Sequence, residues 1–147
     1  MKQVDIIIYE ALTADAELMD DIGHRIKSTC FEVAPTEQDN VDLPYIIVTD
    51  DGFQNQVGTK DDLWESEEDR MQASIEISAK SPAQVKELVK RVRRTVNEYI
   101  IEMAEEGESI PELEALTSDG ISWDWTKPCY FQTLTYQCII QNEEYED

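Results

Sequence analysis

Histidine and positive charge are the scarcest features of this 147-residue chain. It has one histidine, His24, and 12 Lys and Arg residues against 33 Asp and Glu residues, which gives a formal net charge of -21. Lys and Arg supply most of the attraction to phosphate backbones, so this balance disfavours direct binding to DNA or to anionic membranes. Such an acidic chain can still bind basic proteins, imitate nucleic acid, or line a channel along which DNA slides without adhering.

Cysteine is also sparse, and its spacing excludes the common metal sites. Cys30, Cys129 and Cys138 form no Cys-x-x-Cys pair, and an odd count is a poor basis for a disulfide framework. We therefore expect reduced thiols and no metal site built from these cysteines. No apolar run approaches the about 18 residues of a membrane span, and the N-terminus lacks a signal-peptide pattern, so we expect a cytosolic protein.

Catalytic signatures are missing as well. A serine or cysteine nucleophile needs a base within reach, and His24 is the single imidazole. There is no Gly-x-Ser-x-Gly elbow, no Gly-rich phosphate loop with its lysine and no His-Glu-x-x-His helix. Carboxylate pairs such as Asp61–Asp62 occur, but with 33 acidic residues such pairs arise by chance. We expect no enzymatic activity.

A first helical segment is predicted over residues 3–22, where apolar side chains recur on one face. Thr13 and Asp15 interrupt this face with good capping side chains, so the segment forms either one helix or two. Gly23 should end it. A short strand at 25–27 can follow, with His24 exposed before it.

A second helix has the clearest start in the chain. Ser81, Pro82 and Gln84 form a capping box, and an apolar face runs from Val85 to Met103. The side opposite this face carries five basic residues, Lys86, Lys90, Arg91, Arg93 and Arg94. Two interpretations are open: a solvated face with internal pairs such as Glu87 to Arg91, or a positive patch that contacts the acidic loop of a neighbouring copy.

Four strands are predicted, at 45–50, 71–80, 121–125 and 130–140, and the second alternates apolar and polar residues along its length. The Trp123–Trp125 pair should pack under the second helix or at a subunit interface. We expect one domain, residues 1–147, with an α+β fold: an antiparallel sheet of about four strands, with two main helices packed on one face.

Three acidic stretches interrupt this pattern: a loop at 51–69, an insertion at 102–120 with a short helical turn near 111–116, and a charged tail at 143–147. The loop at 51–69 is either a solvated loop or a surface that contacts a partner, and the insertion at 102–120 is expected to be a mobile excursion. As a possible interface with another subunit or with a partner we single out eight residues: Asp61, Asp62, Trp64, Glu65, Lys86, Lys90, Arg93 and Arg94.

The order of these segments resembles a known family. The first feature is a leading helix that ends in the stretch Ala14–Ile26, and the second is the segment Leu43-Pro44-Tyr45-Ile46-Ile47-Val48. The alternating strand before Ser81-Pro82 comes next, and the last feature is a closing strand, Tyr136-Gln137-Cys138-Ile139-Ile140. In these features the chain is similar to the tail-terminator and tail-completion proteins of tailed bacteriophages and prophages. The likeness covers roughly residues 4–100 and 121–141. The acidic insertion and tail depart from the family's pattern.

The resemblance implies a structural virion protein without catalysis or cofactor. Such a protein assembles as a ring with itself, a hexamer, at the head-proximal end of the tail tube, where it ends tube polymerisation. Its partners would be the tail-tube protein and the head-connector protein, and DNA would pass through an acidic lumen without specific binding. The alternative is an acidic interaction module, for example an inhibitor that imitates DNA.

Overall fold

The computed structural model describes residues 4–23, 25–28, 43–56, 68–107, 113–116, 120–125 and 128–141. The described elements follow in the order α1 (Val4–Ala14), α2 (Ala16–Asp21), β1 (Ile26–Ser28), β2 (Tyr45–Gln56), β3 (Glu68–Ala79), α3 (Pro82–Glu105), β4 (Leu113–Ala115), β5 (Ser122–Asp124) and β6 (Cys129–Gln141). Within these ranges no helix is both long enough and apolar enough to cross a membrane.

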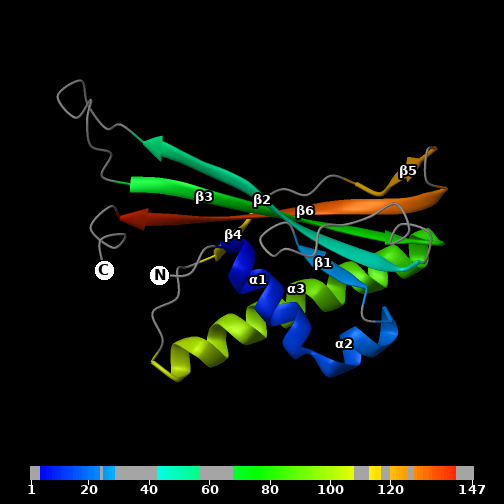
Figure 1. Cartoon of the computed structure of the whole chain (residues 1–147), viewed down its shortest axis with the longest axis horizontal. Coiled ribbons are helices and arrows are strands. Elements are labelled where there is room, and N and C mark those ends of the chain that lie inside the picture. Colours follow the sequence, from blue (N-terminus) through cyan, green and yellow to red (C-terminus); the bar gives the residue numbers. More distant parts are fainter. Residues whose placement is uncertain are drawn as a thin grey trace.

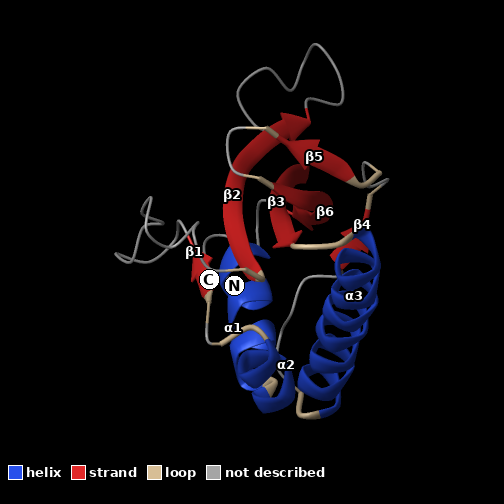
Figure 2. Ribbon diagram, turned by 90° about the vertical axis from the view of Figure 1, so that its right-hand side faces the viewer, coloured by secondary structure: helices blue, strands red, loops and turns tan. Residues whose placement is uncertain are grey.

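The strands form one sheet, and α1 and α3 lie side by side across one of its faces (Figures 1 and 2). The α+β prediction, with both main helices on one face, is confirmed. The sheet has six described strands in the order β1-β2-β3-β6-β4, and β5 pairs with the other end of β6. It is mixed, not antiparallel throughout, because β1 runs parallel to β2 while the other pairs are antiparallel.

The acidic segments contain more regular structure than the sequence suggests. Strands β2 and β3 continue to Gln56 and from Glu68, so both ends of the predicted 51–69 loop are paired strand. Within the 102–120 insertion, Leu113–Ala115 is the strand β4, where a helical turn was predicted. Three residues are too few to show a period in sequence. What defines β4 is its pairing with the long edge of β6.

A β-bulge bends the long hairpin between its two halves. Asp50 pairs with Ala73, whereas Phe53 pairs with Met71, so β2 carries one extra residue between these pairs. Gly52 lies there with a φ of 84°, a conformation that favours glycine. Across the bulge, the β2 positions that lie opposite odd-numbered residues of β3 change from even numbers to odd numbers.

The core lies between the sheet and the helices. Alternate residues of β3, including Ile75 and Ile77, are buried against α1 and α3. The two partners of Ile75, Val48 and Leu134, are buried beside it. The apolar face predicted for the second helix supplies Val85, Leu88, Val92 and Val96. This burial is what holds the two main helices against one face of the sheet.

The first helical segment consists of two helices. Asp15 separates them in an extended conformation, and its Oδ1 accepts a hydrogen bond from Leu18 N at 3.1 Å, which caps α2. Gly23 follows α2 with a φ of 61°, and its N–H donates to Asp20 O. The prediction that Gly23 ends the segment is confirmed. His24 and Cys30 lie outside the described residues, while Cys129 and Cys138 are buried.

Candidate interaction surface

Helix α3 presents three different flanks, and together they define the candidate site. Its apolar flank packs on the sheet. A second flank contacts α1 and α2 through polar side chains. A third flank, which we call the basic flank, carries the exposed residues Lys86, Lys90, Arg93 and Arg94. Because a helix has about 3.6 residues per turn, these four positions share roughly one side.

The polar flank forms contacts at every fourth residue of α3. The Arg91 guanidinium donates to Asp21 and forms an ion pair with it. One turn on, Thr95 Oγ1 donates to Asp15 Oδ2 at 2.8 Å. A further turn on, the Tyr99 hydroxyl donates to Glu10 Oε2 at 3.2 Å.

These contacts correct one prediction and fix which side of α3 faces α1 and α2. Arg91 does not lie with the other basic residues on the exposed side, because it bridges to α2. Its partner is Asp21 and not Glu87. With one flank against the sheet and one against α1 and α2, the basic flank is the side of α3 that these elements leave uncovered.

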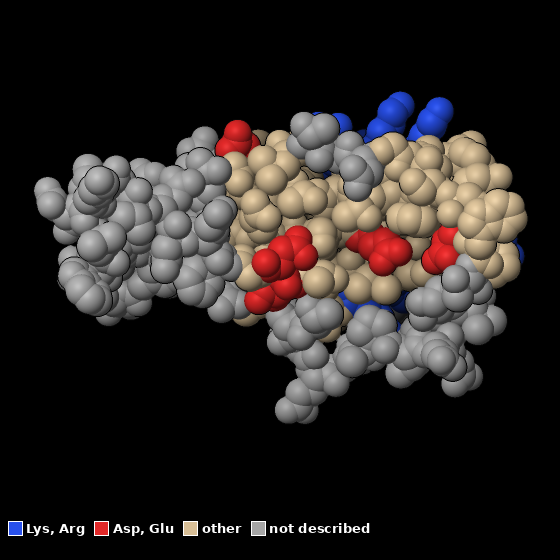
Figure 3. Space-filling view, turned by 90° about the horizontal axis from the view of Figure 1, so that it is seen from above, with Lys and Arg blue, Asp and Glu red and all other residues tan. Residues whose placement is uncertain are grey.

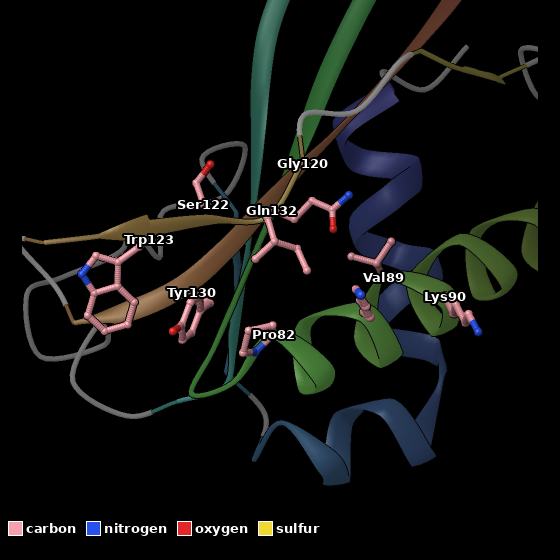
Figure 4. A pocket seen from close by; sticks show the side chains of 10 residues that line it. Pro82, Val89, Lys90, Gly120, Ser122, Trp123, Tyr130 and Gln132 are labelled. Atoms are coloured by element: carbon pink, nitrogen blue, oxygen red, sulfur yellow. The ribbon is translucent and has the colours of Figure 1, made fainter.

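A groove runs between the basic flank and the strands β5 and β6. We call it the α3–β5 groove; it has a volume of about 830 Å³. Its lining residues come from three places in the chain: Pro82, Lys86, Val89 and Lys90 from α3, Gly120, Ile121, Ser122 and Trp123 around β5, and Tyr130 and Gln132 from β6. Figure 4 shows Trp123 and Tyr130 together on the strand side and Lys90 on the helix side.

Aromatic rings form the strand side of this groove. The ring centroids of Trp123 and Tyr130 are 4.7 Å apart with planes at 65°, and Trp123 meets Trp125 edge-on at 5.9 Å. Trp123 is 37% exposed and Trp125 is 86% exposed. These tryptophans therefore do not pack under α3, which leaves an interface as the open interpretation. Exposed tryptophans in contact are typical of surfaces that bind partners.

The basic flank continues past the groove along α3. A second hollow of about 350 Å³ is lined by Lys90, Arg93, Arg94, Asn97, Glu98 and Ile101. Ile101 is 58% exposed. The surface thus combines positive charge with apolar side chains at both ends, Trp123 at one end and Ile101 at the other. Such a surface suits a ligand with carboxylates and apolar groups.

The opposite face of the sheet has a different character. Figure 3, which looks onto this face, shows acidic side chains across its described part and Lys and Arg side chains at its edges. Ser74 faces this side, because its neighbours Ala73 and Ile75 are buried in the core, and its Oγ donates a hydrogen bond to Asp51 Oδ1 at 3.2 Å. The helical side carries charges of both signs, because the basic flank lies on α3 beside exposed carboxylates such as Glu87 and Glu98.

The structure locates half of the residues singled out from sequence. Lys86, Lys90, Arg93 and Arg94 lie together on the basic flank, while Asp61, Asp62, Trp64 and Glu65 lie outside the described residues. Sequence reasoning did not assign Trp123, Tyr130 and Ile101 to the same surface. Only the pairing of β5 with β6 and the path of α3 bring them there. Among the described residues, no group of three or more His, Cys, Asp or Glu side chains could hold a metal ion.

Comparisons with known proteins point to one fold. No protein-family model and no curated protein matches the chain. Among solved structures it is similar to a chain of the "Virion of native gene transfer agent (GTA) particle", with a TM-score of 0.50 and 13% sequence identity. The likeness covers 95% of this chain and 96% of that chain. At this identity it shows a shared fold, over nearly the whole of both chains.

Proposed function

We propose that this chain is a structural protein of a phage-like virion. The observation that carries the proposal is the fold that it shares, over nearly its whole length, with a chain of a gene transfer agent virion. The order of sequence segments, which resembles tail-terminator proteins, supports the same class independently. An assembly role also fits a surface that combines exposed basic and aromatic side chains.

Within that class we propose a tail terminator. Residues 1–147 would act as one assembly unit that forms a ring, a hexamer, at the head-proximal end of the tail tube. The ring would stop addition of tail-tube protein and offer its other side to the head-connector protein. The chain would be made in the cytoplasm of a bacterial host and end in the tail. The net charge of -21 supports this role, because an acidic lumen repels passing DNA.

The test is whether the chain limits tube growth. Tail-tube protein from the same genome is polymerised with and without the purified chain, and tube lengths are measured by negative-stain electron microscopy. Light scattering after size-exclusion chromatography gives the mass of the chain alone and with tubes. We expect shorter tubes that carry the chain at one end, and a particle whose mass is a multiple of 16.9 kDa.

A control separates capping from the effect of an acidic polypeptide. Ile75→Asp places a charge in the buried core, so this variant has nearly the same composition but should not fold. It should leave tube lengths unchanged. Tubes of equal length with and without the folded wild-type chain would reject the tail-terminator proposal.

A further inference from the structure

The α3–β5 groove has a chemistry that specifies what can occupy it. Lys86 and Lys90 place ammonium groups along one side, and Trp123 and Tyr130 offer aromatic surface on the other. Val89 and Ile121 add apolar lining. An occupant that satisfies both sides needs carboxylates next to an aromatic or aliphatic side chain. It also needs to be narrow, as an extended chain segment is.

The chain itself contains a segment of this chemistry. Residues 61–67 read Asp-Asp-Leu-Trp-Glu-Ser-Glu, which places Leu63 and Trp64 between carboxylates on both sides. We call this stretch the acidic segment. The tail at 143–147 has carboxylates around Tyr145, but it lacks an aliphatic neighbour and is shorter.

The sheet places the groove and the attachment points of the acidic segment at opposite ends. The segment lies between Gln56, where β2 ends, and Glu68, where β3 begins. Glu68 pairs with Gln141 at the end of β6. The groove lies at the start of β6, where Gln132 pairs with Ile77. Nine residue steps along β3 separate Glu68 from Ile77, which corresponds to about 30 Å. Figure 1 shows this separation between β5 and the far ends of β2 and β3.

The number of residues between the acidic segment and the strands on either side of it limits which groove the segment can reach. Trp64 is four residues from Glu68, and Asp61 is five residues from Gln56. Fully extended, these stretches span at most about 14 Å and 18 Å. Neither distance reaches a groove about 30 Å away in the same molecule.

We propose that the α3–β5 groove of one copy binds the acidic segment of a second copy. This inference rests on the proposed function in so far as copies of the chain must associate. The contact joins two different surfaces, so it is a head-to-tail contact that repeats from copy to copy and closes into a ring when the rotation allows. It also lets chains of net charge -21 associate, because it places local opposite charges together.

A peptide binding experiment tests the contact directly. A fluorescein-labelled peptide of residues 59–70 is titrated with the full-length chain, and fluorescence anisotropy is recorded at low chain concentration. We expect saturable binding that is weakened at least about tenfold in Lys86→Glu/Lys90→Glu, because two attractive contacts become repulsive. The variant Lys80→Glu reverses an exposed charge just before α3 and should bind as the wild type does. A scrambled peptide of the same composition should bind weakly.

Several results would overturn the inference. Equal binding to the wild type and to Lys86→Glu/Lys90→Glu would show that the groove is not the site. Stronger binding of a peptide of residues 142–147 at the same groove would assign it to the tail instead. No binding of the 59–70 peptide at about 20 mM salt, where charge attraction is least screened, would exclude the contact.

A charge exchange tests the contact within the assembly. Lys86→Glu/Lys90→Glu and Asp61→Lys/Asp62→Lys should each reduce the multimer seen by light scattering, and the variant with all four changes should recover it. If the wild type caps tubes but the peptide does not bind, this inference fails and the proposed function stands. If the peptide binds as expected but tubes are not capped, the tail-terminator proposal fails and the contact stands.

Discussion

Asp15 links α2 to α3 on the helical side. Its Oδ1 caps α2 by accepting from Leu18 N, and its Oδ2 accepts from Thr95 Oγ1 on α3. Burial raises the pKa of Asp15, but the hydrogen bonds from Thr95 and Leu18 and the charge of Arg91 outweigh it, so the pKa falls below its ordinary 3.8. A carboxyl group with a lowered pKa stabilises the fold above its unfolded-state pKa, and this stability is lost as the pH falls through the folded-state pKa.

We therefore predict that Asp15→Asn lowers the free energy of unfolding by an amount that depends on pH. The variant keeps an oxygen that can cap α2 but loses the charge that Arg91 and Thr95 favour. At about pH 6 we expect its free energy of unfolding to be about 1 kcal/mol below that of the wild type, and at about pH 3 we expect this difference to shrink. Urea titrations followed by tryptophan fluorescence measure both values. A difference that stays constant between the two pH values would show that the charge of Asp15 contributes nothing.

The elements differ in how far the sequence predicts them, and length is the reason. Helix α3 and strand β3 have 24 and 12 residues, long enough for their periods to show, and both were predicted near their observed bounds. β4 was missed because only its pairing with β6 defines it. The residues of the α3–β5 groove differ in the same respect. Helical spacing alone predicts that Lys86 and Lys90 share a flank, whereas Trp123 lies beside them only because distant segments of the chain come into contact.

Helix α3 also has an unfavourable C-terminus. Its last turn contains no basic residue, and Glu102 and Glu105 place negative charge where the helix dipole is already negative. Glu105→Lys should therefore raise the free energy of unfolding by about 0.3–1 kcal/mol. Glu87→Lys is the matched control, since it changes the net charge equally but lies near the other end of the helix. Equal gains in thermal melts of the two variants would assign the effect to net charge instead.

At the scale of the whole molecule, charge should make salt act in opposite directions on folding and on association. A net charge of -21 repels itself within one chain, and unfolding relieves this repulsion because the charges move apart. Raising the salt concentration from about 20 mM to about 500 mM shortens the screening length from about 20 Å to about 4 Å. We therefore expect the melting temperature of the isolated chain to rise by several degrees.

The proposed contact between copies should respond in the opposite sense. The lysines of the α3–β5 groove and the carboxylates of the acidic segment attract each other across an exposed surface, so the same salt screens an attraction. The affinity of the 59–70 peptide should fall over the range in which the melting temperature rises. Differential scanning fluorimetry and anisotropy on one salt series measure both. An affinity that rises with salt would mean that apolar contacts with Trp123 and Tyr130 outweigh the charges, and that the net repulsion between copies controls assembly.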